Sequence, residues 1–251
     1  MQPIDEYGYL ILAVNTDTVD YIACAKRLSQ SIKHWNPSAK VCVVTNTECT
    51  DTDFDYVKLL PTVESNPYAY DPYIFRLSPF RETIKLEADM IVASSIDHWW
   101  DLFRHKDVVV SQGCRNYYDN VSLSRQYRKT FDENALPDVY NAITYWRLSN
   151  TAKEFFQVVH AIFQNWTDFK ALIKFPEDIP STDLVYAMAV EIIGCDRCTL
   201  PGSPTMVHMK KHIIGTQTEN WTRELVWEFN PLRINTVAQF GAFHYHIKDW
   251  Q

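Results

Sequence analysis

The stretch Ser78-Pro-Phe-Arg-Glu-Thr-Ile-Lys-Leu-Glu-Ala-Asp-Met-Ile-Val92 places two carboxylates, Glu87 and Asp89, in a segment otherwise typical of a buried strand. A pair of buried acids would destabilise a hydrophobic core, whereas it would stabilise a bound cation. Residues two apart point to the same side of an extended backbone, so both carboxylates would face one ligand. Carboxylate oxygens arranged in this way hold hard divalent cations that are shared with phosphates. The stretch therefore predicts a cation site at the end of a strand.

The composition is that of one compact, enzyme-sized domain. The 251 residues are 46% hydrophobic and 14% aromatic, and no linker-like or repeated segment divides them. The formal net charge of −7 disfavours passive attraction to a polyanion. The N-terminus lacks the basic region of a signal peptide, and six scattered cysteines are typical of reduced thiols. We therefore expect a cytoplasmic protein without membrane insertion.

Apolar runs that alternate with amphipathic segments predict an α/β fold. Residues 9–14 and 41–45 are continuous apolar runs, and apolar side chains recur at helical spacing over residues 19–35 between them. This βαβ unit implies a parallel sheet that binds ligands outside the carboxyl ends of its strands, where Asn15 and Thr16 lie. Further strands are expected at residues 56–60, 83–92, 108–111 and 140–146, with helices at 151–166 and 182–193 that complete a three-layer sandwich.

A glycine-rich phosphate loop does not follow the first strand, since neither Gly-Xaa-Gly nor Gly-Lys-Ser/Thr occurs there. A Rossmann dehydrogenase or a P-loop site loses its main support for this reason. If the sheet binds a nucleotide, something other than helix N-terminal amides must neutralise the diphosphate. A cation held by Glu87 and Asp89 would serve that purpose.

Two segments link these acids to a known family. Arg76-Leu-Ser-Pro-Phe80, followed by the strand that ends in Glu87-Ala-Asp89, resembles the metal-site region of GT-A glycosyltransferases, especially the glycogenin and lipopolysaccharide galactosyltransferase group. In that group an arginine helix precedes a strand ending in Asp-Xaa-Asp, so Glu87 replaces the first aspartate. Val139-Tyr-Asn-Ala-Ile-Thr-Tyr-Trp-Arg147 resembles a strand that reads Asn-Ala-Gly there, with Ile143 in place of the glycine.

Two further matches follow in the same order. Asp183 resembles the acid of the family's acceptor-side Asp-Gln pair, although a helix N-cap is an alternative role for it. Phe243-His-Tyr-His-Ile-Lys-Asp-Trp250 resembles the family's terminal His…Lys-Pro-Trp segment, with Asp249 in place of the proline. The resemblance thus covers most of the chain, and its weight lies in the order of four degenerate motifs.

The resemblance implies a GT-A-like, Rossmann-like single domain over residues 1–251. Residues 1–110 would form the half that binds the nucleotide sugar, and residues 111–251 the acceptor half with a closing C-terminal segment. The implied activity is that of a hexosyl- or pentosyltransferase, acting with retention on a nucleoside-diphosphate sugar, with a UDP-sugar as the first choice.

The implied metal site holds Mn²⁺ or Mg²⁺ through Glu87, Asp89 and a histidine. His244 is the preferred histidine, with His208 and His246 as alternatives. The resemblance also implies that Asp183 and Asn141 orient sugar and acceptor, while Lys248 stabilises the leaving diphosphate. Implied nucleotide contacts are Asn15, Thr16, Arg76, Lys248 and Trp250.

Several alternatives remain open. The overall pattern is also similar to glycosyltransferase-type proteins of large tailed phages, which implies a hydroxymethylated DNA base as acceptor and DNA modification in the host cytoplasm. Glu87 and Ile143 depart from the family pattern and so motivate a second hypothesis, an inactive module that binds nucleotide sugars or glycans. A metal-dependent nucleotidyltransferase is a third hypothesis, disfavoured by the missing glycine-rich loop.

A possible zinc pattern lies outside these motifs. Cys195 and Cys198, with His208 and His212, give Cys-Xaa₂-Cys…His-Xaa₃-His, but the central spacing is shorter than in the usual zinc finger. Because Gly194 precedes this segment, a turn with two free thiols is the competing interpretation.

Overall fold

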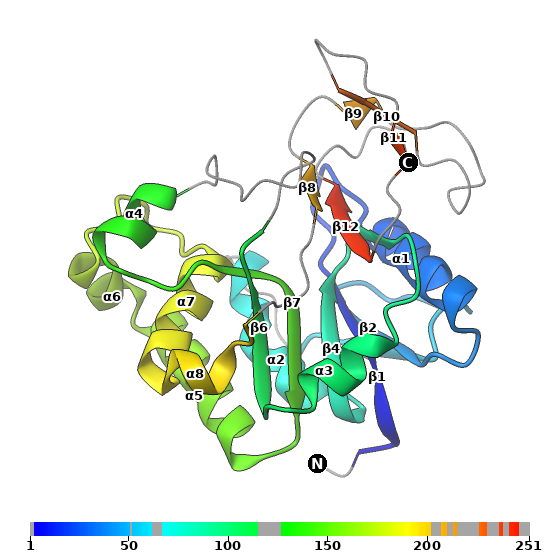
Figure 1. Cartoon of the computed structure of the whole chain (residues 1–251), viewed down its shortest axis with the longest axis horizontal. Helices are drawn as coiled ribbons and strands as arrows, with labels where there is room; N and C mark the ends of the chain where they lie inside the picture. Colours follow the sequence, from blue (N-terminus) through cyan, green and yellow to red (C-terminus); the bar gives the residue numbers. More distant parts are fainter. Residues whose placement is uncertain are drawn as a thin grey trace.

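The computed structural model describes residues 3–50, 52–61, 67–114, 127–201, 207–209, 213–214, 226–229, 236–237 and 241–245. Within these residues the chain forms a six-stranded, mostly parallel sheet with helices on both faces (Figure 1). The predicted three-layer α/β architecture is therefore confirmed. None of the helices in this described part is both long and apolar enough to cross a lipid bilayer.

The main sheet has the strand order β3-β2-β1-β4-β7-β6. Its strands are β1 (Asp5–Ala13), β2 (Val41–Thr45), β3 (Tyr56–Leu59), β4 (Phe80–Glu87), β6 (Val108–Gln112) and β7 (Val139–Arg147). β1 pairs in parallel with β2 and β4, and β7 runs antiparallel between β4 and β6. All five residues of β2 are buried, as a strand covered by helices on both faces requires.

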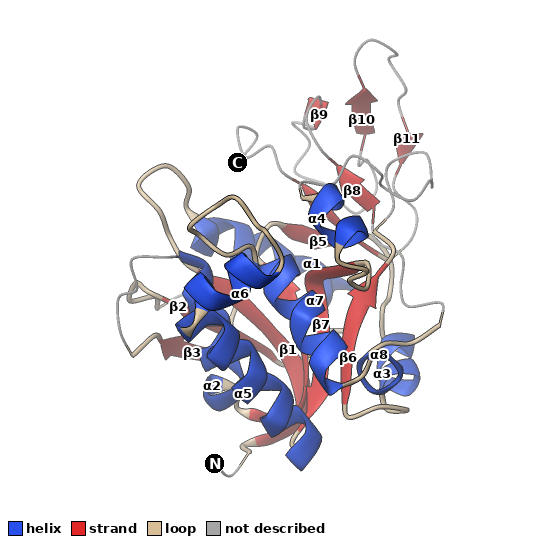
Figure 2. Cartoon of the chain, turned by 90° about the vertical axis from the view of Figure 1, so that its left-hand side faces the viewer, coloured by secondary structure: helices blue, strands red, loops and turns tan. Residues whose placement is uncertain are grey.

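Helices cover the two faces of this sheet. α1 (Tyr21–Trp35) and α3 (His98–Phe103) contribute to one hydrophobic cluster with the sheet, and α2 (Asp71–Leu77), α5 (Asn150–Gln164) and α7 (Thr182–Ile193) contribute to the other. Figure 2 shows the face covered by α2, α5 and α7. The remaining helical segments are η1 (Pro67–Tyr70), α4 (Arg128–Glu133), α6 (Trp166–Leu172) and α8 (Cys195–Cys198).

The helix expected over residues 151–166 is interrupted. α5 ends at Gln164, and the Asn165 N–H donates to the Ala161 carbonyl oxygen at 3.0 Å before α6 begins at Trp166. The Asn165 side-chain amide donates to the same carbonyl oxygen at 2.8 Å, so both donors of this residue satisfy a carbonyl group in the last turn of α5.

The strand expected over residues 83–92 is two strands in two sheets. The chain leaves the main sheet where β4 ends, at Glu87. Ala88 and Asp89 form a turn, and β5 (Met90–Val92) then joins a smaller sheet of order β5-β12-β8. The expectation that both acids lie on one extended backbone is therefore wrong. β8 (Val207–Met209) and β12 (Ala242–Tyr245) complete the smaller sheet, and β9 (Ile213–Ile214), β10 (Val226–Phe229) and β11 (Thr236–Val237) form a third.

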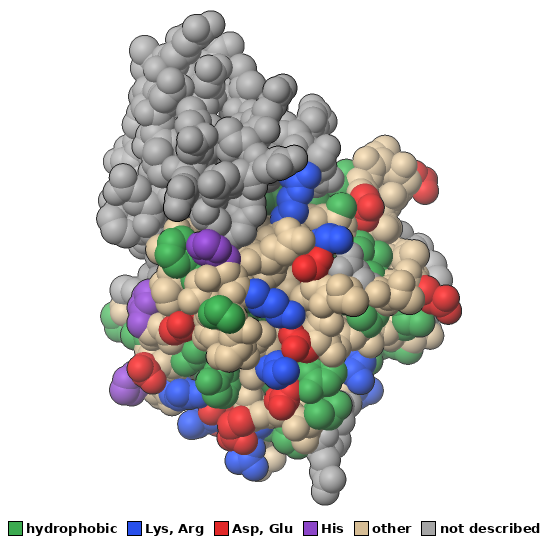
Figure 3. Space-filling view, turned by 90° about the vertical axis from the view of Figure 1, so that its right-hand side faces the viewer, with side chains coloured by type: hydrophobic (Ala, Val, Ile, Leu, Met, Phe, Trp, Pro, Cys, Tyr) green, Lys and Arg blue, Asp and Glu red, His purple; other side chains and the backbone are tan. Residues whose placement is uncertain are grey.

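Basic and acidic side chains are interspersed on the described part of the face in Figure 3. Two aspartates form ion pairs with the lysines of α1 and of the segment before β2. Lys33 and Lys40 lie 2.9 and 3.1 Å from Asp55, and Lys26 lies 3.3 Å from Asp53. These lysines are thus partly neutralised, in keeping with the acidic net charge.

Gly8 lies in β1 at a position without room for a side chain. A Cβ there would lie 2.4 Å from two ring carbons of Phe80 and 2.8 Å from the Lys40 carbonyl oxygen. We expect Gly8→Ala to lower the free energy of unfolding by about 1–3 kcal/mol through overpacking, measured by denaturant unfolding.

Gly113→Ala is the matched control. Gly113 has a φ of +67°, and a Cβ there would meet no described atom within 4 Å, so its cost is backbone strain alone, about 1–2 kcal/mol. A Gly8→Ala protein as stable as the wild type would contradict the close approach of Phe80 to β1.

Candidate active site

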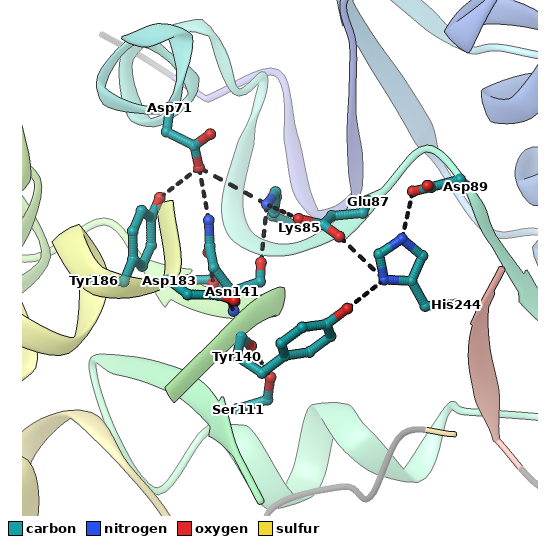
Figure 4. A network of polar contacts seen from close by, with 11 residues as sticks. Asp71, Lys85, Glu87, Asp89, Ser111, Tyr140, Asn141, Asp183, Tyr186 and His244 are labelled. Carbon is teal, nitrogen blue, oxygen red and sulfur yellow. Dashed lines mark hydrogen bonds and ion pairs between the residues drawn. The ribbon is translucent and has the colours of Figure 1, made fainter. Parts of the chain in front are cut away.

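Glu87, Asp89 and His244 meet where the main sheet adjoins the smaller sheet (Figure 4). Glu87 is the last residue of β4, Asp89 lies in the following turn, and His244 lies on β12. His244 Nε2 lies 2.8 Å from Asp89 Oδ1, and His244 Nδ1 lies 3.3 Å from Glu87 Oε2. One ligand atom from each residue lies within 4.8 Å of the others. The structure thus brings together the three residues that the sequence proposes as metal ligands.

Backbone pairing explains how His244 reaches the two acids, although it lies 155 residues beyond Asp89 in the chain. β12 pairs antiparallel with β5, which places His244 opposite Met90. The Tyr245 N–H donates to the Asp89 carbonyl oxygen at 2.9 Å and so extends this pairing into the turn. The turn that removes Asp89 from β4 therefore also positions it beside His244.

Two of the three residues are largely shielded from water, whereas the Glu87 side chain is 28% exposed. Asp89 is 7% exposed and His244 is 4% exposed. Burial raises the pKa of Glu87 because its charged form loses hydration, while His244 and Lys85 oppose this shift and Asp89 adds to it. A bound divalent cation would favour the charged form and lower this pKa. Two carboxylates and an imidazole suit Mn²⁺ or Mg²⁺, so the donor set fits the implied cation.

Tyr140 fixes the orientation of the His244 ring. Its hydroxyl lies 2.7 Å from His244 Nδ1, which leaves Nε2 directed to Asp89. We expect Tyr140→Phe to weaken Mn²⁺ binding by at least about tenfold, because partners that orient a ligand contribute 10–100-fold to affinity. Titration followed by electron paramagnetic resonance measures this affinity.

The control for this prediction lies on the same strand. Tyr145 donates a hydrogen bond to Glu82 at 3.2 Å, away from the cluster. Tyr145→Phe should leave Mn²⁺ affinity unchanged. Equal affinities for the two variants would exclude a role for Tyr140 in orienting the histidine.

A buried polar network adjoins the acid cluster through Lys85. The Lys85 ammonium donates to the Asn141 carbonyl oxygen at 2.9 Å, and it lies 3.8 Å from Asp71 Oδ1 and 3.9 Å from Glu87 Oε1. Asp71 Oδ1 also accepts hydrogen bonds from Asn141 Nδ2 at 3.0 Å and from the Tyr186 hydroxyl at 2.9 Å. Burial raises the pKa of Tyr186, and Asp71 adds to that shift. The Tyr186 hydroxyl therefore stays protonated as a donor.

Asn141 and Asp183 lie together, as the sequence proposes. The Asn141 backbone N–H donates to Asp183 Oδ1 at 2.8 Å. Ser181 occupies the N-cap position of α7, so Asp183 is not the N-cap. The Asn141 side chain is fully buried, and it donates to Asp71 and accepts from Thr144. Asn141 is thus held by Asp183 and Asp71, and the partly buried Asp183 is the more accessible of the proposed pair.

Asn15 and Thr16 follow β1 and shape the loop before α1. The Asn15 N–H donates to Asn46 Oδ1 at 2.9 Å, and Asn46 Nδ2 donates back to the Asn15 carbonyl oxygen at 3.0 Å. Asn15 Oδ1 accepts from the Ile22 N–H, and Thr16 Oγ1 accepts from the Val19 N–H, both at 3.1 Å. The two Asn15–Asn46 contacts join the segments that follow β1 and β2, at the edge of the sheet where ligands bind in folds of this class.

Arg76 is described by the structure and is not part of this cluster. Arg76 is exposed on the last turn of α2, at the opposite end of that helix from Asp71. His246, Lys248 and Trp250 lie outside the described residues. His208 lies on β8, whose backbone pairs with β12 in a register that sets His208 beside His244.

The segment Cys195–Cys198 is a one-turn helix, α8, with free thiols. Burial raises the pKa of Cys198 to about 12, and Gln112 Nε2 lies 3.8 Å from Cys195 Sγ. The group of potential metal ligands found in the described part of the chain is the Glu87, Asp89 and His244 cluster, without these cysteines. His212, the last residue of the possible zinc pattern, lies outside the described residues.

The network contains residues that the sequence alone did not single out. Lys85, Asp71, Tyr140 and Tyr186 are in this class. Lys85 could have been identified from the sequence, since a charged side chain within an apolar strand needs a partner of opposite charge, as Glu87 does. The other three have partners distant in sequence and show no local pattern.

No protein-family model matches the sequence, and no curated protein matches it either. Solved structures do match. Mouse xyloside xylosyltransferase 1 is 11% identical, with a TM-score of 0.54 over 83% of this chain and 89% of that chain. Galactosyltransferase LgtC, solved with donor and acceptor sugar analogs, is 12% identical, with a TM-score of 0.54 over 96% of this chain and 87% of that one.

The bifunctional glycosyltransferase WbbM is 12% identical, with a TM-score of 0.55. That match covers 98% of this chain and 47% of WbbM. These similarities extend over most of the chain and include the sheet that carries the candidate site. The chain therefore has the GT-A fold of glycosyltransferases.

Proposed function

We propose that this protein is a cation-dependent glycosyltransferase that uses a nucleoside-diphosphate sugar, with a UDP-sugar as the preferred donor. The observation that carries the proposal is the joint position of the Glu87, Asp89 and His244 cluster and of Asp183. The Asn141–Lys85 network connects them within a GT-A fold. A cation site next to a carboxylate that can bind sugar hydroxyls suits transfer from a nucleotide sugar.

In this proposal Glu87, Asp89 and His244 would hold Mn²⁺ or Mg²⁺. When bound, the cation would supply the positive charge that stabilises the leaving diphosphate. The protein contributes the orientation of these ligands through Tyr140 and the Asp89 turn. The low exposure of Asp89 and His244 strengthens the electrostatic interaction between them.

Asp183 is proposed to orient the sugar and the acceptor. Its Oδ1 accepts from the Asn141 N–H at 2.8 Å, so the carboxylate is held by β7 while it is carried by α7. A carboxylate oxygen accepts more than one hydrogen bond, which leaves capacity for sugar hydroxyls. Nucleotide contacts from Asn15, Thr16, Arg76, Lys248 and Trp250 stay predictions, as does diphosphate stabilisation by Lys248.

The division into halves at residue 110, retention, a hydroxymethylated DNA base as acceptor and a cytoplasmic site of action rest on the sequence alone and stay predictions. The matched LgtC structure contains donor and acceptor sugar analogs, which supports a sugar donor for the proposal. The acceptor should be sought first among glycans and small molecules, because the chain has a net charge of −7.

Hydrolysis of nucleotide sugars tests the proposal without knowledge of the acceptor. The protein is incubated with individual UDP- and GDP-sugars, with Mn²⁺ or with a chelator, and release of the nucleotide is measured. We expect slow release of UDP from one donor that depends on Mn²⁺ and is lost in Asp89→Asn. Donor binding without release, in the presence of candidate acceptors as well, would identify a binding module and overturn the proposed transferase.

A further inference from the structure

Lys85 is a buried lysine beside the candidate cation site. It lies on β4 two residues before Glu87, and its side chain is 2% exposed. Burial of an ammonium is costly unless opposite charges compensate it. One carboxylate would suffice for that compensation, yet the ammonium lies almost equally far from two, 3.8 Å from Asp71 Oδ1 and 3.9 Å from Glu87 Oε1 (Figure 4).

Asp71 holds this ammonium whatever binds to Glu87. Asp71 Oδ1 is fixed by hydrogen bonds from Tyr186 and Asn141, and the Asn141 carbonyl oxygen accepts from Lys85 itself. Lys85 therefore keeps one carboxylate and one carbonyl when the oxygens of Glu87 turn to another partner. The result is a positive charge of fixed position next to the acid cluster.

This fixed charge acts with opposite signs on the two groups that the proposed function brings to the site. It repels a divalent cation held by Glu87, Asp89 and His244, and it attracts the phosphate oxygens that such a cation would bind. Interactions between buried charges are screened only weakly by water and salt, so the effect reaches beyond direct contact.

On the basis of the proposed function, we propose that Lys85 is a fixed charge of the donor site that weakens binding of a free divalent cation and strengthens binding of a nucleoside diphosphate. The protein then takes up the cation together with the diphosphate, whose negative charge offsets the ammonium. Lys85 does this from a buried position.

The test is the pair of affinities in Lys85→Met. Mn²⁺ affinity is measured without nucleotide by electron paramagnetic resonance, and UDP affinity is measured without metal by calorimetry. We expect Mn²⁺ to bind at least about tenfold more tightly, and UDP at least about tenfold more weakly, than in the wild type. Damage to the site would weaken both. Lys40→Met, at an exposed lysine paired with Asp55, should change neither.

A second variant tests the role of Lys85 without leaving the Asp71 carboxylate buried and unpaired. Asp71→Asn with Lys85→Met removes the charge pair and keeps an oxygen acceptor for Tyr186 and Asn141. Shifts of the same signs but of smaller size are expected, because loss of the Asp71 charge partly offsets loss of the ammonium. Weaker or unchanged binding of Mn²⁺ in the folded variant overturns the role of Lys85. If the wild type binds Mn²⁺ but no UDP with or without metal, the proposed function is wrong. The Mn²⁺ measurement alone then decides the role of Lys85.

Discussion

Asp89→Asn should abolish the stabilisation of the protein by Mn²⁺ with UDP while the protein stays folded. An amide lacks the negative charge that draws the cation to His244 Nε2, which lies 2.8 Å from Asp89 Oδ1. We expect a loss of at least about 100-fold in Mn²⁺ affinity, since even residues that only support a ligand contribute 10–100-fold. Thermal unfolding with and without Mn²⁺ and UDP measures the effect.

The size of the signal follows from linkage. Ligands at 100 times their dissociation constant stabilise the wild type by about 2.7 kcal/mol. For a chain of this length that corresponds to a rise in Tm of roughly 5–10 °C. The Asp89→Asn protein should show no such rise at the same concentrations.

The fold should tolerate this change. The Asp89 backbone carbonyl oxygen that accepts from the Tyr245 N–H remains, and one acid fewer reduces repulsion in the cluster. Asp178→Asn, at an exposed acid paired with Lys170, is the control and should respond to Mn²⁺ and UDP like the wild type. An Asp89→Asn protein that gains as much stability from these ligands as the wild type would show that the cation is held elsewhere.

Asp71→Ala should cost more stability than any other change considered. It removes the acceptor of the Tyr186 hydroxyl and the Asn141 amide, and it removes the carboxylate that holds Lys85. Removal of one partner from a buried ion pair costs about 3–5 kcal/mol, because the Lys85 ammonium then keeps only Glu87 Oε1, at 3.9 Å, and the Asn141 carbonyl oxygen as partners. Denaturant unfolding of the protein without metal measures this loss.

Asp71→Asn separates hydrogen bonding from charge. Its side-chain oxygen still accepts from Tyr186 and Asn141, so we expect a smaller loss, about 1–3 kcal/mol. The predicted order of stability is wild type, then Asn, then Ala. An Asp71→Ala protein with the unfolding midpoint of the wild type would contradict the structural role of this network.

The sheet and the acid pair could be predicted from the sequence because both produce local sequence patterns. Continuous apolar runs at residues 9–14 and 41–45 identify parallel strands, which are buried on both faces. Glu87 and Asp89 are visible because acids interrupt an apolar segment. His244 is reached only through the order of the family motifs, since nothing in its neighbourhood indicates a partner 155 residues earlier.

The turn at Ala88 and Asp89 could not be predicted from the sequence. Met90, Ile91 and Val92 have the same apolar pattern whether they continue β4 or start a strand of another sheet, because apolar periodicity indicates burial and not the pairing partner.

The structure shows what Ile143 does in place of the glycine of the family pattern. Ile143 is buried in β7 opposite Leu86, so it packs in the core at the place of the family's glycine.

Glu87, Asp89 and His244 are proposed to hold a cation that would bind the diphosphate of the donor. Anomalous diffraction at the manganese absorption edge, from crystals of the protein with Mn²⁺ and UDP, locates that cation. We expect one strong peak within bonding distance of Asp89 and His244, adjacent to the diphosphate. A bound nucleotide with no manganese peak at these residues, or with the manganese at another place in the protein, would contradict it.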